Sequence, residues 1–567
     1  MNKPFKGLLN PITMKIRHRA AGFAWIIIAT AGVESAIAAD APNIGTILQQ
    51  VPQNEPLAPL RNKESLPRPT QPEQLSDSKP FLVSRLEIEG NTVFSKGLLH
   101  ALVADQEGQS MGLAGLMALA QRISDYYQNH GYSLTRAIIP AQKIVDGVVR
   151  IQVVEARVGR VKLNNKSEVD DAVLQGIIAD SLKRGELVKQ DGVERAILLI
   201  SDLPGVSAES VVKPGGRVGE SDLDINTKQN NDSWFAGRGT VDTAGGAATG
   251  RARLSTNLNW INPFHQGDLA TINTLSSSSL KYASLGYESA LTTSGMKAGA
   301  SVSNLNYTLG GDMAASGSHG TAQVFSGWFK YPWQRSLNNN LSFQIQLDHT
   351  NLEDDIDSAS STNIRHLNAL VLSAYGDHSA DGRTTLWRVS GTSGSLVIDD
   401  PTSQVNDFYG ANAQGHFSKL SLNLMHLQTL AAGTDLFVRF VAQKANANLD
   451  SSQKLIVGGP NSVRAYDVST LAADGGFDSS FELRRGLGSW GAGQLQGLAF
   501  VDYASVNINA IPWAAAGVNS AQLKGAGLGL NWTTARNTRV KFSLAKPIGA
   551  TDATTKTRGW LELTSMF

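Results

Sequence analysis

From about residue 230 to the last residue, Phe567, polar and apolar side chains alternate along many short segments. In the clearest segment, 251–260, every second position from Ala252 onwards is mostly apolar and the positions between are Arg, Ser or Asn. Because successive side chains of a strand point to opposite faces, such segments form a sheet with one apolar and one polar face. Lipid satisfies no backbone N–H or C=O group, so a spanning sheet must close on itself. The pattern predicts a transmembrane β-barrel with a wet lumen.

The length of this region limits the number of strands. Roughly 340 residues, at roughly 10 membrane residues per strand plus turns, fit about sixteen antiparallel strands, although pattern alone would allow fourteen or eighteen. The Ser- and Gly-rich segments 314–320 and 354–362 are typical of outer loops. We therefore expect residues 230–567 to form an all-β barrel.

Composition excludes several classes of function. The formal charge of +1 gives no basis for electrostatic binding of nucleic acid. There is no cysteine, which removes disulfides and thiolate metal sites. We find no phosphate-binding loop, no H-E-x-x-H, no nucleophile elbow and no metal-spaced histidines. The chain is therefore not expected to be an enzyme, and no cofactor or metal is expected.

Residues 1–39 are predicted to be a signal peptide. Basic residues precede an apolar stretch at 20–33, and the small residues Ala36, Ala38 and Ala39 fit a signal-peptidase site. A membrane anchor is the alternative, but about 14 apolar residues fall short of the roughly 20 that a spanning helix needs. Export and the barrel pattern together predict the outer membrane of a Gram-negative bacterium, with the segments before the barrel in the periplasm.

Two short segments follow. In 40–52, apolar residues at helical spacing predict a turn and a half of amphipathic helix, which is either a frayed terminus or a detachable plug: Ile44, Ile47, Leu48 and Val51. The segment 53–79 is rich in proline, which fixes φ and removes backbone donors, so we expect an extended linker.

Residues 80–155 and 156–229 each predict the order strand, helix, helix, strand, strand. In the first segment an apolar stripe at 113–127 ends at Gly131, and Asp146-Gly147 indicates a tight hairpin. In the second, helices are expected at 169–178 and 192–200. The predicted fold class is thus α+β periplasmic domains followed by an all-β barrel.

Two such βααββ modules before a barrel resemble POTRA domains of the outer-membrane insertase and transporter superfamily. The segments 202–206 (Asp-Leu-Pro-Gly-Val) and 213–215 (Lys-Pro-Gly) are similar to turns of two-partner secretion transporters, the exporters of filamentous haemagglutinin and haemolysin. The resemblance implies that the modules bind the N-terminal secretion domain of a large exoprotein. A sheet edge can accept an extended chain as an added strand. The alternative is that the modules only stabilise the barrel.

The segment 458–467 resembles the loop that this superfamily folds into its own lumen. Its centre reads Val463-Arg464-Ala465-Tyr466, with alanine where the family has glycine. The resemblance implies that Arg464 reaches Asp502 and fixes the loop. It also implies a set of loop-motif and packing residues: Val463, Tyr466, Asp467, Phe481 and Glu482. From spacing alone, these charges could merely line a wet pore.

The resemblance predicts an outer-membrane pore that exports an unfolded adhesin- or haemolysin-type exoprotein without nucleotide hydrolysis. The expected contacts are this exoprotein, outer-membrane lipids and, through the aromatic C-terminal Phe567, the barrel assembly machinery. An insertase of the same superfamily and a passive porin are the alternatives.

Overall fold

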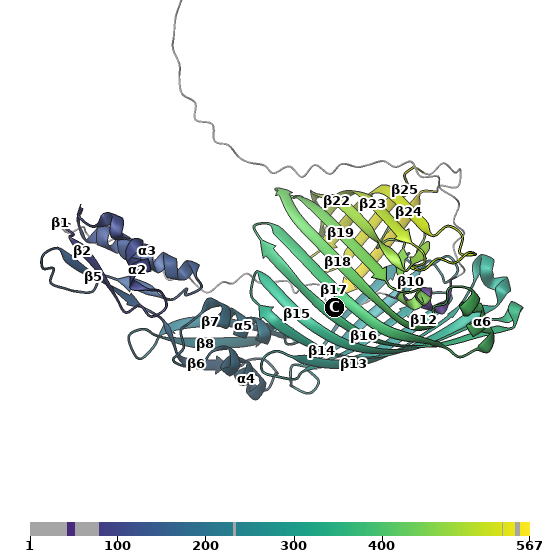
Figure 1. The fold of residues 1–567 in the computed structure, drawn as a ribbon, viewed down its shortest axis with the longest axis horizontal. Coiled ribbons are helices and arrows are strands. Elements are labelled where there is room, and N and C mark those ends of the chain that lie inside the picture. Colours follow the sequence, from purple (N-terminus) through teal and green to yellow (C-terminus); the bar gives the residue numbers. More distant parts are fainter. Residues whose placement is uncertain (1–41, 52–78, 231–233, 536, 550–555) are drawn as a thin grey trace, which may run out of the picture. The chain divides into compact units, whose positions relative to one another are not determined.

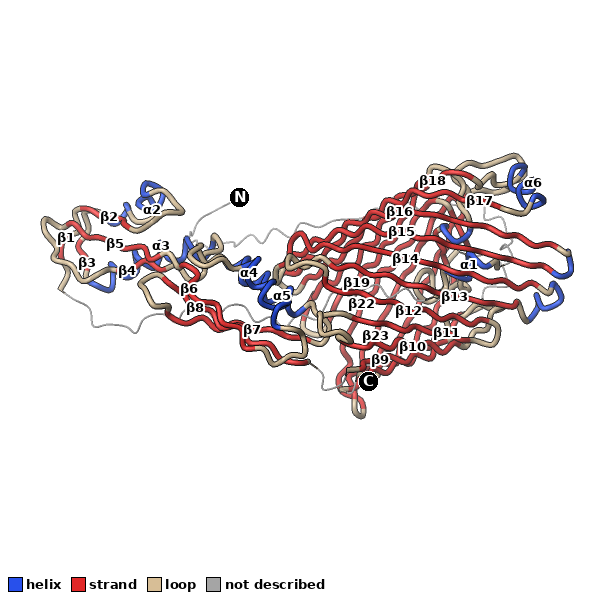
Figure 2. Tube along the Cα trace, turned by 90° about the horizontal axis from the view of Figure 1, so that it is seen from below, coloured by secondary structure: helices blue, strands red, loops and turns tan. Residues whose placement is uncertain are grey.

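The computed structural model describes residues 42–51, 79–230, 234–535, 537–549 and 556–567. Within residues 235–566 sixteen strands form one closed antiparallel barrel, which confirms the predicted fold class (Figures 1 and 2). The strands of the barrel are β9 (Phe235–Asp242), β10 (Arg253–Ile261), β11 (Leu269–Ser276), β12 (Leu280–Ala290), β13 (Lys297–Thr308), β14 (Ser318–Arg335), β15 (Asn339–Ile356), β16 (Ser361–Ala380), β17 (Arg383–Ile398), β18 (Gly415–Ala431), β19 (Thr434–Ala445), β22 (Gly475–Trp490), β23 (Gly493–Asn507), β24 (Ser520–Thr534), β25 (Arg539–Pro547) and β26 (Arg558–Met566).

The last strand closes the barrel against the first. Strand β26 pairs antiparallel with β9, and beyond the strand Phe567 and Gly237 exchange backbone hydrogen bonds of 3.0 and 2.7 Å. Closure leaves no free sheet edge in the membrane, which is the condition for a sheet to cross lipid.

The two faces of the barrel follow the alternation of the sequence. In β10 the apolar side chains of Leu254, Leu258 and Trp260 are exposed on the outer face, and Asn257 between them faces the lumen. The same outer position is taken by large apolar residues in other strands, including Ile345 and Leu347 of β15. The outer face is therefore the lipid-facing one.

Both expected outer loops, 314–320 and 354–362, are shorter in the structure, because residues 318–320 belong to β14 and residues 361–362 belong to β16. Residues 354–356, expected in an outer loop, belong to β15, because Asp354 pairs with Gly320 of β14 and Asn363 of β16. The 3₁₀ turns η2 (Gly311–Ser316) and η3 (Asp357–Ala359) make the actual connections. A short helix, α6 (Pro401–Tyr409), joins β17 to β18.

The first module contains β1 (Phe81–Leu82), β2 (Arg85–Glu89), α2 (Lys96–Ala101), η1 (Ala104–Gln106), β3 (Ser110–Met111), α3 (Leu113–Asn129), β4 (Arg136–Ile138) and β5 (Val148–Val154). Its main sheet has the order β2-β5-β4. Apolar residues of α3, among them Ile123 and Tyr127, pack on this sheet. Gly131 has a positive φ of 87° just after α3, as expected of a residue that ends a helix.

A buried carboxylate stabilises the first module. Glu155 accepts hydrogen bonds from the amides of Thr92 and Val93 at 2.6 and 2.9 Å, and from the hydroxyls of Thr92 and Tyr127. Burial by itself raises the pKa of Glu155, but these hydrogen bonds outweigh it, so the net pKa lies below the ordinary value. The ionised form of Glu155 is therefore the one that stabilises the fold.

The second module contains β6 (Arg157–Asn164), α4 (Asp171–Ser181), α5 (Gln190–Ser201), β7 (Val206–Pro214) and β8 (Glu220–Gln229). Its sheet has the order β6-β8-β7, and both helices bury apolar residues such as Leu174 and Leu199 against it.

The predicted signal peptide 1–39 and most of the predicted linker 53–79 lie outside the described residues. Among the described helices, none combines the length and the apolar character that crossing a membrane requires.

Candidate functional site

The connection between β19 and β22, residues 446–474, folds back into the lumen. It contains η4 (Ser451–Gln453) and a small hairpin of β20 (Leu455–Val457) and β21 (Leu471–Ala473). The tip of the hairpin, residues 458–467, touches β22, β23, β24 and β26. We call residues 446–474 the lumen loop.

Arg464, at the tip of the lumen loop, is buried against the barrel wall. Its guanidinium donates to both carboxylate oxygens of Asp502, from Nε at 2.9 Å and from Nη2 at 2.7 Å, and its backbone amide donates to Asp502 at 3.0 Å. It also donates to Glu482 at 2.6 Å and to the hydroxyl of Ser480 at 2.7 Å. The N–H groups of the planar guanidinium thus donate hydrogen bonds to three side chains on two neighbouring strands.

The charges around Arg464 are balanced. Glu482 accepts two further hydrogen bonds, at 2.8 and 2.6 Å, from Arg484, so two arginines alternate with two carboxylates. Arg464 lies 3.3 Å from the ring centroid of Phe500, and Arg484 lies 3.9 Å from that of Phe437. Paired charges and stacking on aromatic rings reduce the cost of burying both guanidiniums.

The backbone of the loop explains how alanine is accepted at its tip. Ala465 is absent from the described residues with positive φ, whereas Gly458 and Gly459 at the start of the hairpin have φ of 107° and 96°. The positive φ values, which are unfavourable for residues with a side chain, therefore occur at the two glycines and not at Ala465. Gly525 of β24 leaves room for the methyl group of Ala465, because a Cβ built at Gly525 would lie 2.6 Å from it.

Three further residues of the predicted set lie in the loop. Val463 is fully buried in an apolar cluster with Leu523, and Tyr466 packs on its edge. Asp467 pairs with Arg251 at 3.0 Å and with Arg558 of β26 at 2.6 Å. These contacts hold the loop to a second part of the wall.

Phe481, which was predicted with the loop-motif and packing residues, lies on the outer face of the barrel. Ser480 and Glu482 both face the lumen, so the alternation of β22 turns Phe481 between them to the outer face, where it is 52% exposed. The ring beneath Arg464 belongs instead to Phe500, the cross-strand partner of Glu482.

A second lumen element is α1 (Ile44–Leu48). Its side chains Ile44 and Ile47 are fully buried in an apolar cluster formed by lumen-facing residues of the barrel, including Leu305, Leu352 and Leu396. Figure 2 shows α1 in blue, and the helix contacts β14, β15 and η4. A helix of five residues is not stable alone in water, so α1 depends on these contacts.

A buried ionic network holds α1, and sequence reasoning did not find it. The amide of Ile44 donates to Asp354 at 2.8 Å, as does the hydroxyl of Tyr307 at 2.6 Å. Arg365 forms ion pairs with Asp354 and, at 2.8 Å, with Asp450 of the lumen loop. The network therefore joins the helix, the wall and the loop.

The other end of the α1 segment contacts the lumen loop directly. Gln49 donates to the backbone carbonyl of Ser451 at 2.7 Å, and Gln50 donates to the hydroxyl of Ser469 at 3.2 Å. Arg253, itself paired with Asp242, donates to the carbonyl of Gln50 at 2.9 Å. Displacement of either element would remove contacts from the other.

A local signal could have identified the missed network. Asp354 and Arg365 sit at inward positions of the alternating pattern once β15 and β16 are extended past the predicted loop.

Among the described residues, no group of three or more His, Asp or Glu is placed to hold a metal ion.

The fold and the site define a class of protein, an outer-membrane β-barrel transporter whose lumen is occupied by its own chain and which is preceded by POTRA-type domain structure. A family model described as haemolysin secretion/activation protein ShlB/FhaC/HecB matches residues 219–532, and one described as POTRA domain, ShlB-type, matches residues 81–156. The chain belongs to the ShlB/FhaC/HecB family of two-partner secretion transporters, which are not enzymes.

Relatives agree with this assignment. The heme/hemopexin transporter protein HuxB of Haemophilus influenzae (strain 86-028NP) is 28% identical over 492 residues, which cover 86% of each chain. The outer membrane transporter CdiB of Escherichia coli O6:K15:H31 (strain 536 / UPEC) is 25% identical over 189 residues, 33% of this chain and 31% of that one. The family supports secretion of partner proteins across the outer membrane, and the chain lies in that membrane.

Solved structures show the same fold. CdiB from Escherichia coli superposes with a TM-score of 0.69 at 18% identity, over 89% of this chain and 94% of that one. BamA from Haemophilus ducreyi lacking POTRA domains 1–3 gives a TM-score of 0.51 at 15% identity, over 86% and 100%.

Proposed function

We propose that this transporter exports one large, unfolded exoprotein of the adhesin or haemolysin type, without nucleotide hydrolysis. The observation that carries the proposal is that a closed barrel holds two elements of its own chain, α1 and the lumen loop, by side-chain contacts rather than by continuous sheet. Such elements can leave the lumen without opening the barrel.

In this proposal each segment has a separate role. Residues 1–39 direct export to the periplasm, 40–52 are the plug and 53–79 are the tether. The domains POTRA 1 (80–155) and POTRA 2 (156–229) bind the N-terminal secretion domain of the exoprotein by strand addition. The barrel (230–567) contacts outer-membrane lipids, and the barrel assembly machinery recognises Phe567.

The Arg464–Asp502 pair is proposed to hold the resting state. Both side chains are buried, so the pair is stable while the loop is seated and is lost as a unit when the loop moves. Folding of the exoprotein outside the cell supplies the driving force, since native stability accumulates at roughly 0.05–0.15 kcal/mol per residue over a long chain.

The relatives suggest which cargo to test first. HuxB, the heme/hemopexin transporter, matches over 86% of both chains, whereas CdiB of Escherichia coli O6:K15:H31 matches over 33% of this chain. A secreted partner that binds hemopexin is therefore the first candidate.

The test is secretion of a large exoprotein, which is to be sought in the gene next to that of this transporter, by the transporter with and without residues 80–229. We expect the deletion to abolish secretion while the barrel still assembles. If secretion persists, these residues do not capture the exoprotein, and flux of small solutes alone would support a porin. Loss of other outer-membrane barrels from the cell would instead support an insertase.

A further inference from the structure

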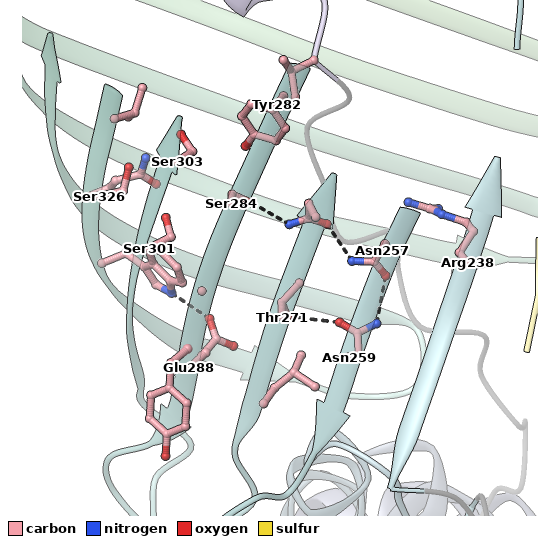
Figure 3. Close-up of a pocket in the computed structure, with 18 of the residues that line it drawn as sticks. Arg238, Asn257, Asn259, Thr271, Tyr282, Ser284, Glu288, Ser301, Ser303 and Ser326 are labelled. Atoms are coloured by element: carbon pink, nitrogen blue, oxygen red, sulfur yellow. Dashed lines mark hydrogen bonds between the residues drawn. The ribbon is translucent and has the colours of Figure 1, made fainter. Parts of the chain in front are cut away.

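Cavities lie on both faces of the barrel wall. A cavity of about 1470 Å³ is in the lumen, and polar side chains that line it bond to one another. Thr271 donates to Asn259 at 3.1 Å, and Asn259 donates to Asn257 at 2.9 Å (Figure 3). A second cavity, of about 520 Å³, lies at β16, β17, β18 and β19. Ligand clefts commonly measure roughly 300–1,000 Å³, so the second cavity can hold part of a small molecule.

The second cavity is a groove on the lipid-facing side of the wall, and we call it the outer groove. The three leucines that line it, Leu370, Leu372 and Leu420, are exposed on the outer face, whereas Ala369 lines the lumen cavity. Cross-strand pairing arranges the lining in two adjacent rows, which are Leu372, Gly391, Leu420 and Lys444, and Leu370, Ser393, Ser418 and Asn446.

A glycine makes the groove hollow. Gly391 lies between Leu372 and Leu420, and a Cβ built at Gly391 would meet no atom within 4 Å. Atoms that line a gap lose dispersion contacts, so an unfilled hollow in the membrane is unfavourable. A flexible acyl chain that bends into the hollow restores these contacts.

The groove crosses the outer edge of the apolar band. The chain enters the barrel at β9 from the periplasmic domains, and neighbouring strands are antiparallel, so β19 runs outward as β9 does. Lys444 is the last but one residue of β19, and Phe440 and Ala442 precede it on the same face. On β16, the exposed Asn368 follows Leu370 in the outward direction. The groove is thus apolar toward the membrane and polar toward the outside.

The charge of the groove is positive. Lys419 and Lys444 line it, and none of the described residues in its lining is acidic. The ammonium group of Lys419 donates to the carbonyl of Gln453 in the lumen loop at 2.7 Å, so it lies on the other side of the wall. Lys444 is exposed and forms no ion pair with another described residue. An anionic group at the polar end of the groove would therefore complement Lys444.

We propose that the outer groove binds one phosphorylated lipid of the outer leaflet, with an acyl chain against Gly391 and the phosphate at Lys444. The barrel lies in the outer membrane, so lipid is the material that faces this side of the wall. A phosphorylated lipid supplies both the apolar chain and the anion that the two ends of the groove require. The site makes the proposed contact with outer-membrane lipids specific, and it does not depend on the proposed export.

Two substitutions in the full-length chain test the two ends of the site. Lys444→Ala removes the charge, and Lys281→Ala is its matched control, because Lys281 is exposed at the outer end of β12. Gly391→Phe fills the hollow. Its matched control is Gly327→Phe on β14, where a Cβ would also meet no atom within 4 Å and the exposed Phe329 marks the same outer face. Neither glycine has a positive φ, so phenylalanine fits the backbone at both positions.

The purified variants are titrated in detergent with lipid A, and bound lipid is measured by native mass spectrometry. For Lys444→Ala, the lipid concentration at half saturation should rise about tenfold, as expected for the loss of one charge-assisted hydrogen bond. It should not change for lipid A whose phosphates have been removed. Gly391→Phe should raise it at least about tenfold for both lipids, because displacement of about two methylene groups is sufficient. Both control variants should bind as the unmodified chain does.

Equal effects of Lys444→Ala and Lys281→Ala, or of Gly391→Phe and Gly327→Phe, would overturn the inference. Displacement of the lipid by an equal concentration of inorganic phosphate would also overturn it, because the site would then recognise the anion alone. The proposed export is judged separately, by secretion after removal of residues 80–229. Failure of the lipid site is therefore distinguishable from failure of export.

Discussion

The Arg464–Asp502 pair provides the sharpest quantitative prediction. Asp502→Asn preserves the shape of the side chain but removes the charge that accepts three hydrogen bonds from Arg464. Loss of one partner of a buried ion pair costs roughly 3–5 kcal/mol. Because each 1.4 kcal/mol is a factor of ten, the open state of the loop should become about 100- to 4,000-fold more populated.

The assay is the rate at which a thiol-specific reagent modifies Ser462→Cys in the lumen loop. Ser462 is 7% exposed, and its hydroxyl has no hydrogen-bond partner among the described residues, so the cysteine removes no side-chain hydrogen bond. When the loop closes faster than the reagent attacks, the rate follows the open population. While the loop closes faster than the reagent attacks, Asp502→Asn should therefore raise the modification rate by about 100- to 4,000-fold.

The matched control is Glu562→Gln, which removes a lumen carboxylate paired with Lys541 at 2.9 Å but 35% exposed. An exposed pair contributes roughly 0–1 kcal/mol, so the rate should change less than about fivefold. If Asp502→Asn gives no larger change than this control, the pair does not hold the loop, and the charges only line the pore.

Three further outcomes are expected. Asp354→Asn removes the charged acceptor of the Ile44 amide, a bond worth roughly 1.5–3 kcal/mol, so the open probability of the barrel pore in planar bilayers should rise at least about tenfold. An unchanged conductance would exclude a role for Asp354 in holding α1. Phe500→Leu should speed loop labelling roughly 2- to 30-fold by loss of the stacking interaction, whereas Phe481→Leu on the lipid face should not change it. The pKa of Glu155 is lowered in the folded state, so the stabilisation by this carboxylate is present above the ordinary value of 4.5 and is lost as the pH falls through the lower folded value. Hydrogen exchange of the first module should therefore accelerate in acid. Glu155→Gln should remove that part of the pH dependence.

Local patterns were sufficient for most of the fold. Alternation along β10 or β15 fixes which residues face lipid, because the side-chain period of a strand is two. The apolar stripe of α3 and the glycine after it fixed that helix in the same way. The outward position of Phe481 also follows from this alternation. The motif-based assignment of Phe481 to the packing residues did not take the two-residue period of the strand into account.

The sequence by itself determined the closed sheet, the two βααββ modules and, through the resemblance, the choice of Arg464 and Asp502. Only the tertiary structure brought Asp354, Arg365 and Asp450 together around α1 and placed Phe500 beneath Arg464. Side-chain direction is a local property of the strand, with a period that the sequence displays. Contacts across a lumen depend instead on the register and closure of all sixteen strands, which no local segment encodes.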